Sequence, residues 1–170
     1  MDKSIVLLSG GMDSATALSI AKRKKLSCYA LTMDYGQKHS IEIEKAKLIA
    51  EHFQVVEHKI IEIDLTVFGG SALTDKNINI PEHESQGIPV TYVPARNTIF
   101  FSLALAWAEV IQANSIYSGV NAIDYSGYPD CRPEFIKAMQ ALVNLATKAT
   151  VEGSSIAIEA PLLNMNKMDI

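Results

Sequence analysis

Apolar residues along this chain gather in short continuous runs that alternate with longer segments of helical spacing. Residues 5–8 form such a run and stop before Gly10 and Gly11, as expected for a strand buried on both faces. In residues 14–24, apolar positions recur at helical intervals, and a basic end suits the carboxyl end of a helix dipole. The chain therefore begins with a predicted strand, a glycine-rich turn and a predicted helix.

The same alternation continues along the rest of the sequence. It predicts further strands at residues 28–33, 55–63, 115–120 and 156–160. It predicts further helices at residues 40–53, 97–111 and 133–147. Asn97 is the predicted N-cap of the second of these helices. Strands that alternate with helices form βαβ units, so we expect an α/β fold with a mostly parallel five-stranded sheet and helices on both faces.

Polar segments follow several of the predicted strands, at residues 9–14, 34–39 and 121–132. The carboxyl ends of parallel strands meet at one edge of a sheet, and ligands bind there, near the switch in strand order. Residues 66–91 form a long stretch with little periodicity, and an excursion of that length is usually functional or disordered. We therefore expect a ligand site where the polar segments meet.

Composition and charge narrow the class of protein. The chain has 170 residues, of which 48% are hydrophobic and 20% charged, which suits one domain with its own core. Its formal net charge is -4 and its pI about 5.5, so stable binding to nucleic acid is disfavoured. Cys28 and Cys131 fit no metal spacing and are predicted to be reduced thiols. No apolar run could cross a bilayer and the amino terminus lacks signal-peptide features, so a cytoplasmic location is expected.

The loop at residues 9–14 reads Ser-Gly-Gly-Met-Asp-Ser. Two glycines allow a tight turn and a close approach of a ligand, and the helix that follows presents free N–H groups to phosphate. Ser9 and Ser14 add hydroxyl donors. The loop is neither a Walker loop nor the Gly-x-Gly-x-x-Gly of dinucleotide binders, so NAD is not expected. A tight turn capped by Ser14 is the simpler alternative, but the complete hexapeptide between a strand and a helix favours phosphate binding.

This hexapeptide resembles the signature of the PP-loop ATP pyrophosphatases, which bind ATP in this loop and adenylate a carbonyl or carboxylate oxygen. Residues 34–39, 92–100 and 119–135 resemble one branch of that family, the 7-cyano-7-deazaguanine synthases of queuosine biosynthesis. The resemblance extends from residue 4 to the end of the sequence. It implies a Rossmann-like (adenine nucleotide alpha hydrolase-like) fold and a single PP-loop ATP-binding domain over residues 1–170.

The resemblance implies an ATP-dependent ligase that converts 7-carboxy-7-deazaguanine and ammonia to 7-cyano-7-deazaguanine. ATP activates the carboxylate, ammonia then gives the amide, and a second activation allows dehydration to the nitrile. Mg²⁺ should accompany ATP, held mainly by phosphate oxygens, with Asp13 as a further candidate ligand. The expected partners are these small molecules, with no stable nucleic acid and no membrane, and a homodimer stays an open alternative to a monomer.

Two other functions stay open. Another PP-loop ATP pyrophosphatase could modify tRNA, although the acidic pI and the lack of a Cys-x-x-Cys sulfur relay stand against it. A non-catalytic nucleotide-binding regulator could use the same fold, but it would not need the second-substrate loop at residues 124–132. A turnover assay separates the three functions.

By this resemblance the nucleotide lies on the first loop, and Asp34 and Tyr35 receive the adenosine. Arg96 places a fixed charge on the phosphates as the pyrophosphate departs, with a solvated loop residue as the alternative. Lys167 corresponds to a lysine that the family brings back towards the phosphates. The expected nucleotide-binding residues are Leu8, Ser9, Gly10, Gly11, Met12, Asp13, Ser14, Asp34, Tyr35 and Arg96, and the expected catalytic residues are Asp13, Arg96 and Lys167.

The expected substrate-binding residues are Asp124, Tyr125, Tyr128, Asp130 and Arg132. A carboxylate can accept adjacent N–H donors of a deazaguanine, an aromatic ring can stack on its face, and Arg132 suits a substrate carboxylate. By composition alone an exposed turn is an equal interpretation, and the resemblance favours substrate binding. The roles of Asp124 and Asp130 are not separable from the sequence.

The 7-cyano-7-deazaguanine synthases carry a carboxy-terminal cluster of four cysteines that holds structural Zn²⁺, and residues 1–170 contain no such cluster. Either the cluster lies beyond Ile170 or the protein lacks it. We expect the former, with the zinc ligands outside residues 1–170, so no residue of this chain is assigned to zinc.

Overall fold

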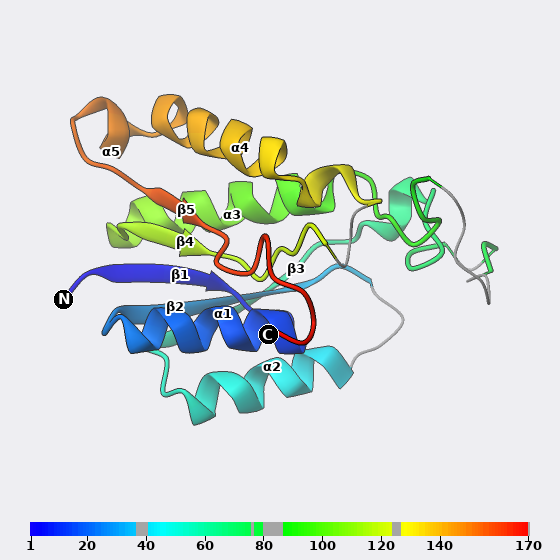
Figure 1. Ribbon diagram of the computed structural model, residues 1–170, viewed down its shortest axis with the longest axis horizontal. Helices are drawn as coiled ribbons and strands as arrows, with labels where there is room; N and C mark the ends of the chain where they lie inside the picture. The colour runs from blue at the N-terminus through cyan, green and yellow to red at the C-terminus, as the bar shows by residue number, and fades with distance from the viewer. Residues whose placement is uncertain (37–40, 76, 80–86, 124–126, 170) are drawn as a thin grey trace.

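The computed structural model describes residues 1–36, 41–75, 77–79, 87–123 and 127–169, and Figure 1 shows the arrangement of the elements. The strands are β1 (Lys3–Leu7), β2 (Ser27–Asp34), β3 (Glu57–Glu62), β4 (Ser115–Tyr117) and β5 (Ala157–Glu159). The helices are α1 (Met12–Arg23), α2 (Ile41–His52), α3 (Arg96–Ile111), α4 (Pro133–Ala146) and α5 (Lys148–Val151), with short 3₁₀ helices η1 (Thr66–Phe68) and η2 (Pro129–Cys131). The predicted order of strands and helices is confirmed.

The five strands pair in parallel in the order β3-β2-β1-β4-β5, which confirms the predicted α/β fold class. The chain runs outward from β1 to β2 and β3, and then crosses back to place β4 on the other side of β1. The strand order therefore switches between β1 and β4, and the loops that follow these strands lie side by side. A Cβ atom on Gly119, after β4, would sit 2.6 Å from the carbonyl carbon of Asp13, after β1. A crevice for ligands is expected at this switch.

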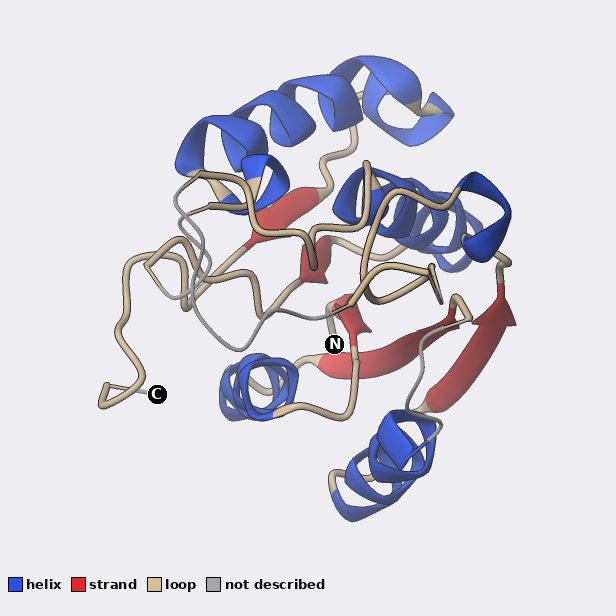
Figure 2. Ribbon diagram, turned by 90° about the vertical axis from the view of Figure 1, so that its right-hand side faces the viewer, coloured by secondary structure: helices blue, strands red, loops and turns tan. Residues whose placement is uncertain are grey.

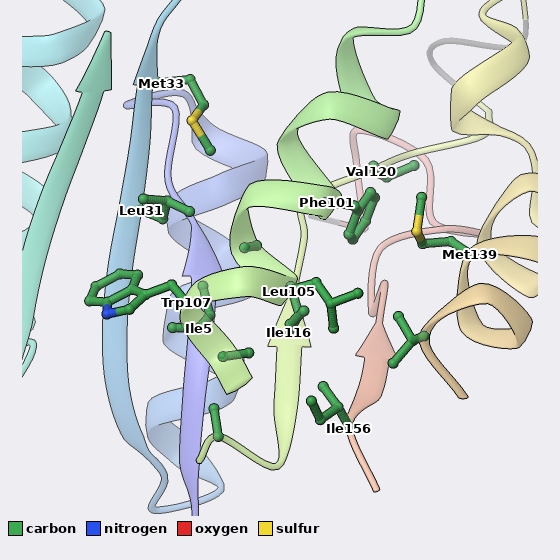
Figure 3. Close-up of a cluster of buried hydrophobic side chains, with 14 of the residues drawn as sticks. Ile5, Leu31, Met33, Phe101, Leu105, Trp107, Ile116, Val120, Met139 and Ile156 are labelled. Carbon is green, nitrogen blue, oxygen red and sulfur yellow. The ribbon is translucent and has the colours of Figure 1, made fainter. Parts of the chain in front are cut away.

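Helices cover both faces of the sheet, with α1 and α2 on one face and α3 and α4 on the other (Figures 1 and 2). Alternate side chains of β1 point to opposite faces, so Ile5 joins the core under α3 while Val6 joins the core under α1. Figure 3 shows the α3 side, where Phe101 and Trp107 pack with Ile5 and Ile116. Among the described helices, none has both the length and the apolar character needed to cross a membrane.

The start of α3 differs from the prediction. The helix begins at Arg96 after the N-cap Ala95, so the prediction of Asn97 as N-cap is wrong, and Asn97 is a buried residue of the first turn. Ala95 has the left-handed values φ 55° and ψ 17°. Its N–H donates to Tyr92 Oη at 3.1 Å, while the N–H of Asn97 donates to Asp130 Oδ2 at 3.0 Å. The second of these contacts joins distant segments, which local sequence patterns cannot indicate.

The predicted helix over residues 133–147 is confirmed as α4, and a further short helix, α5, follows it. Thr147 lies between them in an extended conformation, and its Oγ1 accepts a hydrogen bond of 3.2 Å from the N–H of Thr150. A threonine side chain that accepts from a first-turn N–H is a helix N-cap. The residue predicted to end one helix therefore begins the next.

Candidate active site

A cavity of about 580 Å³ opens at the carboxyl edge of the sheet, at the switch between β1 and β4. Its volume lies in the range of roughly 300–1,000 Å³ that is typical of small-molecule sites. The end of β1 and residues 8–14 form one wall. The end of β2, the first turns of α2 and α3, the loop after β4, and Tyr128 complete it. The predicted ligand site at this edge therefore coincides with an observed cavity.

The two glycines of the first loop serve different purposes. Gly10 is buried with φ +83°, and a Cβ atom there would collide with the carbonyl oxygen of Glu42 in the first turn of α2. Gly11 is exposed with φ -86°, and the nearest atom to a Cβ there would be Ser9 Oγ at 3.5 Å. The fold itself thus requires Gly10, whereas Gly11 leaves open space beside the amino-terminal end of α1.

Two serines shape the same loop. Ser14 Oγ donates to the carbonyl oxygen of Gly11 at 2.9 Å and accepts from the Ser9 N–H and hydroxyl, each at 3.1 Å. These bonds hold the loop closed against the first turn of α1, whose first N–H groups have no partner within the helix. Helix N–H groups and the helix dipole form an anion site, so the loop is suited to phosphate.

Arg96, the first residue of α3, lines the cavity. Its Nη1 donates to Tyr35 Oη at 3.5 Å, and its guanidinium carbon lies 5.8 Å from the centre of the Tyr35 ring. The Tyr35 ring lies 5.5 Å from the ring of Phe100, one turn further along α3. Burial opposes the charge on Arg96, but Tyr35 and the Asp130 carboxylate outweigh it and raise the pKa of the guanidinium. The cavity therefore holds a permanent positive charge between β2 and α3.

Tyr128 forms the wall of the cavity nearest to α4. Its hydroxyl lies 2.6 Å from Thr91 Oγ1, and its ring lies 5.9 Å from the ring of Tyr92. Beside it, a Cβ atom on Gly127 would sit 2.6 Å from Cδ of Pro89. The end of the long excursion after β3 therefore packs against the loop before α4, and together they build this wall.

Lys167 reaches the cavity from the segment after β5. The segment is held by Asn121, which is fully buried and whose Nδ2 donates to the carbonyl oxygens of Leu162 at 3.1 Å and Met165 at 2.6 Å. The N–H of Ala122 also donates to the carbonyl oxygen of Leu163 at 3.0 Å. The loop after β4 thus places an exposed lysine opposite the glycine loop.

The cavity brings together most of the residues that the sequence analysis assigned to the nucleotide. These are residues 8–14, Tyr35, Arg96 and Lys167, with Tyr128 from the expected substrate loop. Of the other described candidates, Asp34 ends β2 outside the cavity wall, Asp130 is buried behind it, and Arg132 is exposed before α4. Asp124 and Tyr125 lie outside the described residues.

Several residues that line the cavity were not predicted: Met33, Glu42, Lys45, Phe100, Ser118, Gly119 and Cys131. Met33 and Phe100 carry apolar side chains in a predicted strand and a predicted helix, where the pattern indicates only a core. Ser118 and Gly119 fell inside the predicted strand 115–120, but β4 ends at Tyr117. The glycine was the available signal, because glycine in a strand often marks a close approach of other backbone.

Neither the two cysteines nor the acidic side chains of the described residues form a metal site. Cys28 and Cys131 are both buried and unpaired, and burial followed by the Asp130 carboxylate raises the pKa of Cys131 to about 11. Cys131 is therefore a protonated thiol at neutral pH. In the part of the chain that the structure describes, no group of three or more His, Cys, Asp or Glu side chains could hold a metal ion. The expectation of zinc ligands outside residues 1–170 stays a prediction.

A parallel sheet, a glycine loop at a helix amino terminus and three cationic side chains around one cavity define a nucleotide-binding α/β domain of the PP-loop class. The solved structure of a predicted subunit of tRNA methyltransferase from Methanocaldococcus jannaschii has this fold. The two proteins are 19% identical and superpose with a TM-score of 0.60. The match covers 99% of the present chain and 72% of the Methanocaldococcus jannaschii chain. At that identity the likeness supports the fold alone.

Comparisons of sequence identify the family. The family model described as Queuosine biosynthesis protein QueC matches residues 3–170. A 7-cyano-7-deazaguanine synthase of Pseudomonas putida (strain W619) is 58% identical over 168 residues, which is 99% of this chain and 75% of that protein. One from Pseudomonas aeruginosa (strain LESB58) is 56% identical over the same shares. The chain belongs to the QueC family of queuosine biosynthesis, and the predicted resemblance is confirmed. The family implies an enzyme that uses ATP and acts on small molecules.

Proposed function

We propose that this chain catalyses the ATP-dependent conversion of 7-carboxy-7-deazaguanine and ammonia to 7-cyano-7-deazaguanine. The observation that carries the proposal is one cavity with two different ends, in a chain whose relatives bear the name of this synthase. One end is the glycine loop with its helix N–H groups. The other end is the aromatic wall around Tyr128, and Arg96 also lines the cavity.

The nucleotide end can hold a triphosphate. It lies at the positive end of the α1 dipole, where the first N–H groups of a helix can bind phosphate, and Gly11 offers no side chain that would block the approach. Arg96 and Lys167 add charges that can stabilise the departing pyrophosphate. Asp13 in the first turn of α1 lines the cavity, and a carboxylate oxygen is a suitable further ligand for Mg²⁺ that is held mainly by phosphates.

The substrate end suits a flat heterocycle. The Tyr128 ring lines the cavity there, and aromatic faces stack well on a purine-like ring. Asp124 and Tyr125 stay in the proposal as ligands of the deazaguanine, although they lie outside the described residues. Arg132 is exposed, so a contact with the substrate carboxylate would be made at the mouth of the cavity.

The chemistry requires two activations of one carbon atom. A carboxylate oxygen of the substrate attacks the α-phosphate of ATP and releases pyrophosphate. Ammonia attacks the acyl carbon of the adenylate, AMP leaves, and loss of a proton gives the amide. The amide oxygen is then adenylated in the same way, and loss of AMP and two protons leaves the nitrile. The share of the protein is positioning and stabilisation of negative charge, by residues that already surround the cavity.

The proposal also covers partners, location, oligomeric state and zinc. The net charge of -4 supports small-molecule partners without stable nucleic acid, and we place the enzyme in the cytoplasm, with a homodimer as the alternative to a monomer. Structural Zn²⁺ with ligands outside residues 1–170 stays a prediction from the family. Elemental analysis of protein that includes the expected cysteine cluster tests it, and one zinc per chain is the expected result.

The testing experiment is a turnover assay. The protein is incubated with ATP, ammonium and 7-carboxy-7-deazaguanine, and the nitrile is followed by mass spectrometry. The nitrile should form only when all three substrates are present. Arg96→Ala should lower kcat by about 100-fold, as for loss of one transition-state donor, while the exposed Arg23→Ala at the end of α1 should leave it unchanged. Binding of ATP without nitrile would favour a regulator, and ATP-dependent modification of tRNA would favour the other alternative.

A further inference from the structure

We propose that Asp130 is a positioning residue for Arg96, because it caps the start of α3 from a distant loop and so fixes the helix end that carries the guanidinium. This role differs from the expected contact of Asp130 with the deazaguanine. The inference rests on the proposed function. It also has a readout that does not require turnover, so its failure can be distinguished from failure of that function.

The first turn of α3 has no cap of its own. Its N-cap is Ala95, which carries no side-chain oxygen and adopts φ 55°, whereas a capping residue is usually extended and polar. A left-handed conformation is unfavourable for alanine, and Tyr92 Oη helps to hold it by accepting the Ala95 N–H at 3.1 Å. The helix start that carries Arg96 therefore depends on contacts from other segments.

Asp130 supplies the missing cap. Its Oδ2 accepts the backbone N–H of Asn97 at 3.0 Å, and the Asn97 side chain donates back to the Asp130 carbonyl oxygen at 3.0 Å. The side-chain Nδ2 of Asn97 also donates to Cys131 Sγ at 3.4 Å. Asp130 is 5% exposed and Asn97 8% exposed, so these bonds are protected from water. This reciprocal pair resembles a capping box, built between segments 33 residues apart.

The carboxylate also suits this place electrostatically. It lies at the positive end of the 16-residue helix α3, where negative charge is favourable. Its charge also supports the protonated form of Arg96, which is the residue immediately before Asn97. Asp130 thus fixes the backbone that carries Arg96 and adds a favourable, smaller interaction with its charge, after that of Tyr35.

The loop around Asp130 reaches the cavity through other residues. Tyr128 and Cys131 line the cavity, as does Asn97, whereas Asp130 lies behind them. A ligand of the deazaguanine would have to present its carboxylate to the cavity. Asp130 instead directs one carboxylate oxygen at the backbone of α3, so the same short loop contributes Tyr128 to the site and Asp130 to the support of Arg96.

A double-mutant cycle with Arg96 tests the proposal. Asp130→Ala should lower kcat by about tenfold through misplacement of Arg96, with the KM for 7-carboxy-7-deazaguanine changed by less than about threefold. Asp130→Asn keeps an oxygen that can accept the Asn97 N–H, and it should recover most of the lost kcat. In the Arg96→Ala background, Asp130→Ala should lower kcat by less than about twofold further. The exposed Glu134→Ala, in the first turn of α4, is the matched acidic control.

Two results would overturn the proposal. A tenfold loss of kcat in the Arg96→Ala background would show that Asp130 acts independently of Arg96. A tenfold or larger rise in the KM for the deazaguanine in both Asp130→Ala and Asp130→Asn would make Asp130 a substrate ligand. If Asp130→Ala does not fold, the KM of Asp130→Asn for the deazaguanine decides alone. A tenfold or larger rise would then make Asp130 a substrate ligand.

If the wild-type protein gives no nitrile, the proposed function fails and the link to Arg96 is tested by binding instead. The affinity for a non-hydrolysable ATP analogue should then fall in Asp130→Ala and in Arg96→Ala without further loss in the double variant. Additive losses would contradict the inference. Hydrogen exchange at the Asn97 amide should be faster in Asp130→Ala than in the wild type, and unchanged exchange would equally contradict it.

Discussion

The glycine loop of residues 9–14 and the start of α3 face the same cavity but are held in different ways. The glycine loop is shaped mainly by its own side chains, with Ser14 Oγ bonded to both Ser9 and Gly11. The start of α3 is shaped from elsewhere, by Asp130 of a loop 33 residues further along the chain. A sequence motif therefore marks the part of the site whose geometry is local, and only the structure shows how the start of α3 is held.

The largest expected effect separates the two glycines of the loop. Gly10→Ala should destabilise the protein by roughly 3 kcal/mol or more, because the added Cβ collides with backbone of α2 at a left-handed φ. Gly11→Val should change the free energy of unfolding by less than about 1 kcal/mol, because the structure leaves space there. It should nevertheless abolish binding of an ATP analogue.

Urea unfolding and calorimetry check this pair. If Gly11→Val bound the analogue with wild-type affinity, the placement of the triphosphate on this loop would be wrong. If Gly10→Ala were as stable as the wild type, the contact between the loop and α2 would not be a requirement of the fold.

The next effect concerns the segment that carries Lys167. Asn121→Ala should destabilise the protein by about 2 kcal/mol, since the buried carbonyl oxygen of Leu162 and the half-buried one of Met165 lose a donor, and it should lower kcat because Lys167 is no longer held over the cavity. Lys167→Ala should lower kcat by roughly tenfold or more while the free energy of unfolding stays within about 0.5 kcal/mol, because the lysine is exposed. Unchanged kcat in both variants would remove Lys167 from the site.

The wall around Tyr128 should give a smaller effect. Thr91→Val removes the hydroxyl that lies 2.6 Å from Tyr128 Oη, and the loss of one hydrogen bond is worth about 1 kcal/mol. The KM for 7-carboxy-7-deazaguanine should rise by about fivefold with the affinity for an ATP analogue unchanged. Tyr128→Phe should give a similar rise, and the double variant should add little to either. A change in nucleotide affinity instead would assign this wall to ATP.

The smallest effect is a dependence of stability on pH. Thr32 Oγ1 donates to the carbonyl oxygen of Leu8 at 2.6 Å and so accepts from His58 Nε2 at 2.8 Å. Burial, with a further contribution from Lys47, lowers the pKa of His58 below its usual 6.5. Below about pH 6.5 the unfolded chain therefore binds more protons than the folded chain. The free energy of unfolding falls with pH over this range, until the pH reaches the lower pKa of His58 in the folded state.

The measurement is the urea midpoint at pH 7.5 and 5.5 for the wild type and for His58→Gln. The glutamine amide can donate to Thr32 without titrating, so the variant should lose less stability on acidification than the wild type. An equal loss in both proteins would show that His58 does not contribute to the pH dependence.

Much of the fold could be predicted from the sequence. Buried strands such as residues 5–8 and helices such as residues 133–147 leave periodic patterns that need no knowledge of their neighbours. The glycine loop was visible for the same reason, since strand, loop and helix are contiguous. The N-cap role predicted for Asn97 is wrong, because its bonds to Asp130 join segments that only the folded chain brings together. The substrate-binding role predicted for Asp130 by resemblance stays a prediction.

The most direct test of the two-ended cavity is a set of calorimetric titrations with two ligands, a non-hydrolysable ATP analogue and 7-carboxy-7-deazaguanine. They are made on the wild type, Gly11→Val and Tyr128→Ala. Gly11→Val should lose the nucleotide and keep the affinity for the deazaguanine within about threefold, whereas Tyr128→Ala should weaken the deazaguanine by about tenfold or more and keep the nucleotide. If both variants lost the same ligand, or if each lost the ligand assigned to the other end, the account of the cavity would be contradicted.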